Sequence, residues 1–96
     1  MSKAIDDVVD ERQRQIGAEG FDAMHDDEHA RGDLAVAGAC YALHTDAHPD
    51  AGDPPPEWPW EPQWWKPKDT RRDLVRAAAL IIAEIERIDR ALSEDA

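Results

Sequence analysis

The stretch from residue 70 to residue 92 constrains the fold most, because it runs without glycine or proline. Apolar residues recur in it at alternating steps of four and three positions, which is typical of one face of an amphipathic helix. This aliphatic stripe consists of Leu74, Ala78, Ile81, Ile85, Ile88 and Leu92. Val75 and Ile82 widen it, so we expect the helix to bury the stripe against two neighbours. Thr70 and Asp73 have the spacing of a capping box, which predicts a helix start at Thr70.

Two further helices are expected before this one. The first covers residues 2–16, with Ser2 as a candidate cap and Gly17 as a candidate stop. The second covers about 27–44, and its firm part from residue 33 to 43 carries small apolar residues that would let the aliphatic stripe approach closely. The sequence therefore predicts an all-α fold, a three-helix domain spanning 1–96. The heptad spacing of the stripe and the thin core of so short a chain favour a homo-oligomer, a dimer in the simplest case.

The segment at 45–69 has a different composition. All 7 prolines and all 4 tryptophans of the chain lie between residues 49 and 67. Proline excludes a continuous helix, whereas plain disorder is poor in aromatic residues. We expect an extended strap that wraps the helices between the second and the third. Its tryptophans either complete the core or, at Trp64 and Trp65, stack on a flat ligand.

The charge balance excludes one class of function. The chain has 22 acidic and 11 basic residues and a net charge of −11, so it is not expected to bind nucleic acid generally. It has no apolar run long enough for a signal peptide or a membrane span, which predicts a cytoplasmic protein. The single cysteine, Cys40, lies in an apolar run and is interpreted as a small core residue.

A dense group of candidate metal ligands follows the first helix. These are His25, Asp26, Asp27 and His29. Imidazole and carboxylate ligands together suit a divalent ion, Mg or Mn here and Zn less well. The alternative is that the aspartates cap a helix and complement its dipole.

Two glutamates are candidate catalytic residues. Glu11 and Gln15 lie one helical turn apart, either on a solvated face or turned together into a site. Glu84 interrupts the apolar run from residue 77 to 85, so we expect its carboxylate to point into a site as well.

The approach to the last helix is basic. Lys66, Lys68, Arg71 and Arg72 surround its predicted N-terminus, where free backbone N–H groups and the helix dipole also favour an anion. With Trp64 and Trp65, three of them (Lys66, Arg71 and Arg72) form a candidate ligand-binding group for phosphate. The alternative is that these bases neutralise the acidic N-terminal region.

Four segments together resemble a family of small uncharacterised proteins encoded by tailed phages and by prophages of proteobacteria. They are ERQRQ at 11–15, GFDAMHDDEHARGDLA at 20–35, WPW with WWKP at 58–67, and RRDLVRAAALIIAEIERIDR at 71–90. As a short helical chain with Glu and Asp on facing helices, the protein is also distantly similar to the MazG-like all-α nucleotide pyrophosphohydrolases. Those proteins pair an ExxE helix with an ExxD helix. Here Asp7 and Glu11 are four apart, and Glu84 and Arg87 stand where the second acidic pair would be.

Three functions follow from these features, and they leave open whether the protein is an enzyme. The first is a nucleotide-directed, metal-dependent phosphohydrolase in which the His–Asp group holds the ion and Glu11 or Glu84 completes the site. The second is a phage anti-defence sponge that binds a host nucleotide signal without chemistry, using the tryptophans and the basic helix start. The third is an acidic protein that inhibits a host factor by imitating nucleic acid.

Overall fold

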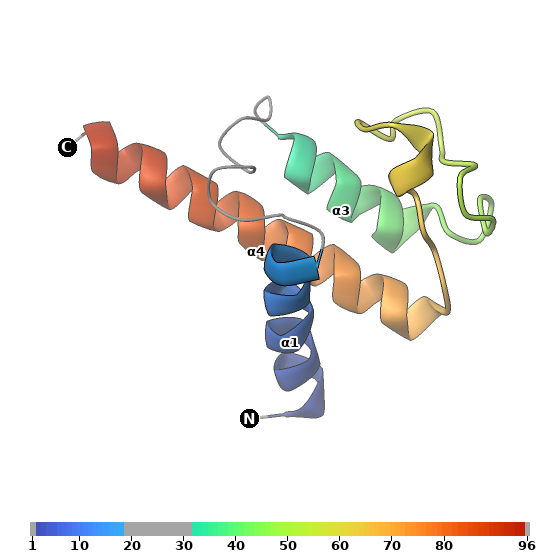
Figure 1. Cartoon of the computed structure of the whole chain (residues 1–96), viewed down its shortest axis with the longest axis horizontal. Coiled ribbons are helices and arrows are strands. Elements are labelled where there is room, and N and C mark those ends of the chain that lie inside the picture. Colours follow the sequence, from blue (N-terminus) through green and yellow to red (C-terminus); the bar gives the residue numbers. More distant parts are fainter. Residues whose placement is uncertain (1, 19–31, 96) are drawn as a thin grey trace.

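The computed structural model describes residues 2–18 and 32–95, and within these ranges every regular element is a helix. The elements are α1 (Lys3–Ala18), α3 (Asp33–Leu43), the short 3-10 turn η1 (Pro62–Trp64) and α4 (Thr70–Asp95). Figure 1 shows α4 as the long central helix, with α1 crossing it on one side and α3 running beside it on the other. The predicted all-α class is confirmed, whereas the predicted helical residues 27–31 lie outside the described ranges. No helix in the described part of the chain is long and apolar enough to cross a membrane.

The first helix begins as predicted but buries a different face. Ile5 N–H donates to Ser2 Oγ at 3.2 Å, so Ser2 is its cap. The helix continues through Gly17 to Ala18, so the predicted stop at Gly17 was wrong. Three of its aliphatic residues, Ile5, Val9 and Ile16, are largely exposed. The face that packs on α4 carries instead the buried polar residues Glu11, Arg12 and Gln15.

The start of α3 is completed by a residue of another helix. Its N-cap is Gly32, which has a left-handed φ of 88° and provides no side chain for capping. Glu84 of α4 accepts a hydrogen bond from Gly32 N–H at 3.0 Å. The carboxylate thereby takes one of the N-terminal donors and sits where the helix dipole favours negative charge.

Close contact between α3 and α4 depends on Gly38. A Cβ atom at this position would lie 3.0 Å from the carbonyl oxygen of Ala77 and 3.1 Å from Cγ1 of Ile81. The prediction that small residues of the second helix admit the last helix closely is thus confirmed. The contact uses Ala77, Leu80 and one stripe residue, Ile81, and not the whole stripe.

Helix α4 begins at Thr70, as predicted, but a different residue caps it. Asp69 Oδ1 accepts from Arg72 N–H at 2.9 Å, and Asp73 Oδ1 accepts from Lys68 N–H at 2.8 Å. Asp69 is therefore the N-cap, and the capping box predicted for Thr70 and Asp73 was wrong by one position. Asp73 still contributes, because it reaches back to the residue that precedes the cap.

The aliphatic stripe of α4 is not the buried face of the helix. Its five large members remain 43–63% exposed, namely Leu74, Ile81, Ile85, Ile88 and Leu92. The buried positions are Asp73, Val75, Arg76, Ala77, Ala79, Leu80, Ala83 and Glu84. The expectation that the stripe packs within the chain was wrong, because α3 and α1 occupy the adjoining face, which is built from small and charged residues.

The Pro/Trp segment completes the core around Tyr41. Trp65 is fully buried and stacks on the Tyr41 ring at 4.7 Å between centroids, while Trp58 meets the same ring edge-on at 5.5 Å. Tyr41 Oη accepts from Lys66 N–H at 3.0 Å, and Trp65 Nε1 donates to the carbonyl oxygen of His48 at 3.1 Å. Cys40 is buried in this cluster, as predicted, and burial raises the pKa of its thiol.

Candidate functional site

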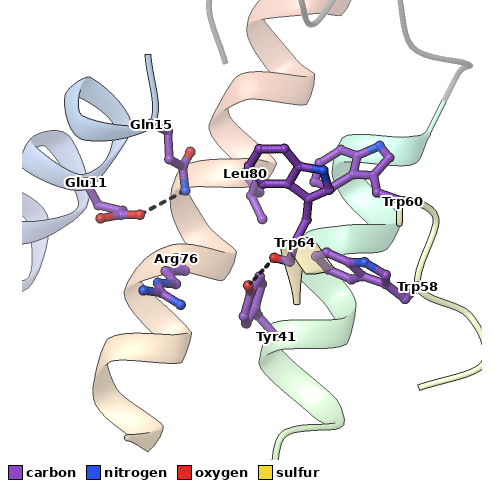
Figure 2. A pocket seen from close by; sticks show the side chains of 8 residues that line it. All are labelled: Glu11, Gln15, Tyr41, Trp58, Trp60, Trp64, Arg76 and Leu80. Atoms are coloured by element: carbon purple, nitrogen blue, oxygen red, sulfur yellow. Dashed lines mark hydrogen bonds between the residues drawn. The ribbon is translucent and has the colours of Figure 1, made fainter. Parts of the chain in front are cut away.

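A narrow crevice lies where α1, α4 and the Pro/Trp segment meet. Figure 2 shows side chains of α1 on one side, aromatic rings on the other, and two side chains of α4 between them. It is lined by Glu11, Gln15, Tyr41, Trp58, Trp60, Trp64, Arg76 and Leu80. The cavity volume of the crevice is about 10 Å³, which is enough for about one water molecule. We call this site the aromatic crevice.

Glu11 forms the centre of its polar wall. This carboxylate is 1% exposed, and it accepts hydrogen bonds from Arg14 Nε at 2.7 Å, from Gln15 Nε2 at 3.1 Å and from Arg72 of α4. Burial by itself would raise the pKa of Glu11, but the bonds and charges of Arg14, Arg72 and Gln15 outweigh burial and lower it. Glu11 is therefore an ionised anchor between α1 and α4.

Two buried polar atoms of the crevice wall are left without a partner in the part of the chain that the structure describes. They are Gln15 Oε1, an acceptor, and Arg76 Nε, a donor. Gln15 is 2% exposed and Arg76 is 7% exposed, so bulk water does not hydrate these atoms freely. An unsatisfied buried polar group costs about 1–3 kcal/mol, so a water molecule or a ligand group that reaches these atoms would stabilise the crevice.

The aromatic side of the crevice has buried rings and one exposed ring. Trp58 and Tyr41 belong to the buried core, and Trp60 packs edge-on against Trp58 at 5.4 Å. Trp64 is 40% exposed, and Lys66 Nζ lies 5.1 Å from the centre of its ring. Of the two tryptophans predicted to meet a ligand, Trp64 lines the crevice, whereas Trp65 is buried in the core.

Glu84 has a separate environment. It pairs with Arg87 one turn later and accepts from Gly32 N–H, and it lines a groove with Ile88 and Leu92. The two predicted catalytic glutamates therefore lie in different clefts. Each is already bonded to positively charged or N–H donors of the chain.

Two of the four basic residues around the start of α4 pair with acidic residues of α1. Arg71 Nη1 lies 2.8 Å from Asp7 Oδ2, and Arg72 pairs with Glu11. This is the neutralising role that the sequence offered as an alternative to phosphate binding. Lys66 instead lies over Trp64 at the mouth of the crevice.

The predicted metal ligands His25, Asp26, Asp27 and His29 lie outside the described residues. Within residues 2–18 and 32–95, no group of three or more His, Cys, Asp or Glu side chains could hold a metal ion.

Sequence reasoning missed Arg76, Tyr41 and Trp60 as site residues. Arg76 stands between Val75 and Ala77 in an apolar run, which is a signal for burial. Tyr41 gave no such signal, since an aromatic residue on a helix face of small residues is equally suited to a plain core. No protein-family model, curated protein or solved structure matches the chain.

Proposed function

We propose that this protein binds a small nucleotide-class ligand in the aromatic crevice and releases it unchanged. The observation that carries the proposal is the pair of unpartnered buried atoms, Gln15 Oε1 and Arg76 Nε, in a crevice that is also lined by Tyr41 and three tryptophans. A buried acceptor, a buried donor and flat aromatic surfaces are the groups that recognise the edge and the face of a nucleobase.

Binding requires the crevice to widen at Trp64. The closed space accepts about one water molecule, so a base enters only when an indole moves aside. Trp64 is the suitable element, because it is 40% exposed and lies in the short η1 turn and not in a long helix. Lys66, beside its ring, would then lie near the phosphate part of the ligand.

The state of the two glutamates favours binding over hydrolysis. A general base works best with a pKa near the working pH, whereas the pKa of Glu11 is lowered by Arg14, Arg72 and Gln15. Glu84 is engaged by Arg87 and by the start of α3. If the chain is phage-encoded, binding without turnover would withdraw a host nucleotide signal.

The test is a retention assay with a defined pool of linear and cyclic nucleotides, with and without Mn²⁺. The protein is mixed with the pool and filtered, and each nucleotide is quantified in the filtrate and in the fraction released by heat. We expect one class to be depleted from the filtrate and recovered intact. A pool that passes through unchanged would contradict the proposal.

A matched pair of variants locates the binding. Trp64→Ala removes an exposed crevice ring, and we expect retention of the depleted nucleotide to weaken at least tenfold, since stacking on an aromatic ring contributes about 1–3 kcal/mol per base. Leu43→Ala removes an exposed large side chain of α3 that does not line the crevice, and it should bind like the wild type. Equal losses in both variants would place the ligand elsewhere.

Catalysis would be recognised in the same assay. A new product that needs Mn²⁺ would replace the binding proposal by a metal-dependent phosphohydrolase. The variant Asp26→Asn/Asp27→Asn then decides whether the His–Asp group holds the ion, because loss of turnover with unchanged helical circular dichroism is expected only in that case.

A further inference from the structure

The aliphatic stripe of α4 is an apolar surface that the described chain leaves uncovered. Its five large side chains are 43–63% exposed. It continues onto α1 through a shallow pocket lined only by Ala4, Ile5, Val8, Val9 and Ile82. An exposed apolar face that runs along much of a 26-residue helix is of the kind that often marks an interaction site.

The spacing of the stripe is suited to another helix of the same kind. Steps of four and three residues keep one seam facing a partner helix over several turns, as in coiled-coil packing. The 26-residue helix α4 is about 39 Å long. Figure 1 shows its C-terminal end extending past α1 and α3, so a second helix can lie along it.

The stripe is complementary to itself in an antiparallel register centred on residue 83. In this register Leu74 lies opposite Leu92 of the second copy, Ala78 opposite Ile88, and Ile81 opposite Ile85. All six positions then have a stripe residue as partner, and the smallest one, Ala78, faces a large one. A parallel pair would instead place Ala78 against Ala78 and leave a gap in the seam.

Charge favours the same orientation. Lys66 and Lys68 precede α4, whereas Arg71 and Arg72 already pair with α1, and the last residues of the helix, 94 and 95, are both acidic. An antiparallel pair brings the basic start of each helix to the acidic end of the other and also opposes the two helix dipoles. A parallel pair brings like charges together at both ends.

We propose that this face binds a second copy of the chain, with the two α4 helices antiparallel and packed through the aliphatic stripe. Because successive residues are about 100° apart around a helix, Ile85 points about 140° away from Leu80. Each aromatic crevice therefore stays open on the outer side of the dimer.

The first test is the solution mass of the full chain by sedimentation equilibrium between about 5 and 200 μM. We expect a dimer of the 10.8 kDa chain. Ile85→Glu places a charge in the seam and should weaken association at least tenfold while helical circular dichroism is kept. The matched control is Leu43→Glu, which changes an exposed leucine of α3 outside the stripe and should remain dimeric. A monomeric wild type at 200 μM would overturn the proposal, and so would a dimeric Ile85→Glu.

The second test checks the orientation in a Cys40→Ser background. Chains carrying Ala78→Cys and chains carrying Ile88→Cys are mixed and oxidised. An antiparallel pair cross-links unlike chains, since the two positions face each other within disulfide reach. Cross-links only between like chains would overturn the antiparallel register. Both tests are independent of the nucleotide, so they can fail while the proposed function stands.

Discussion

Glu11 carries a buried charge that also joins two helices. Its carboxylate is buried between α1 and α4, and it holds Arg14 of its own helix and Arg72 of the other. A buried charge survives only with such partners, because desolvation is costly. The same bonds that make Glu11 an effective structural anchor lower its pKa and make it a weak base. Glu11 is therefore better suited to hold the two helices together than to act as a general base.

The variant Glu11→Gln should destabilise the protein by about 2 kcal/mol, because it leaves two guanidinium groups without their counter-charge. The loss is smaller than for a fully buried pair, since the side chains of Arg14 and Arg72 are 36% and 33% exposed. Urea unfolding followed by circular dichroism measures it. Asp10→Asn, an exposed acid of the same helix, should change stability by less than about 0.5 kcal/mol. Similar losses for both variants would contradict the role of Glu11.

At the scale of the elements, two glycines inside helices have opposite surroundings. Gly38 of α3 lies against the backbone of α4, whereas Gly17 of α1 has no atom near the position of an added Cβ. Glycine in a helix interior is less favourable than alanine by roughly 0.5–1 kcal/mol. At Gly38 the close approach of α4 offsets this cost, and at Gly17 no contact does.

The two alanine variants should therefore shift stability in opposite directions. Gly38→Ala should cost about 1 kcal/mol, because its Cβ meets Ala77 O at 3.0 Å and the helices must separate slightly. Gly17→Ala should gain about 0.5 kcal/mol through helix propensity alone. Thermal unfolding of both variants beside the wild type measures the difference. Stabilisation by Gly38→Ala would show that the two helices are not in close contact.

At the scale of the whole molecule, α4 holds two neighbours by different forces. The contact with α3 and the Pro/Trp segment is a buried core of aromatic and aliphatic side chains. The contact with α1 relies on ion pairs, in which Asp7, Glu11 and Arg12 of α1 bind Arg71, Arg72 and Glu86 of α4. Ion pairs of carboxylates depend on pH, whereas buried apolar contacts do not, so acid should act on one contact first.

Hydrogen exchange of the full chain at pH 7 and at pH 3.5 tests this difference. The pKa values of Asp7 and Glu11 are lowered from 3.8 and 4.5 in the folded state. Their contribution to stability is thus fully present above those values and is lost as pH falls through the folded pKa values. We expect the protection factors of α1 amides to drop at pH 3.5 before those of α3 and α4. A uniform drop in all helices would mean that α1 is not separately docked.

Local sequence signals predicted the described helices and most of their starts. Ser2 was recognised as a cap, and the start of α4 was placed at Thr70, because capping and periodicity depend on residues a few positions apart. Gly17 misled the prediction, since the helix continues through it to Ala18. Of the candidate site, Glu11, Gln15 and Trp64 were found, each because a polar or aromatic residue stood in an informative local pattern.

The sequence by itself determined that α1, α3 and α4 are helices and that a tryptophan-rich segment joins the last two. Only the tertiary structure decided which face of each helix is buried. Leu80 and Ile81 are neighbours in one apolar run, yet Leu80 is 2% and Ile81 is 43% exposed. The physical reason is that burial depends on where distant elements pack. The ion pairs of α1 and the close contact at Gly38 draw α4 onto a face of small and charged residues, and its most apolar face remains available to a partner.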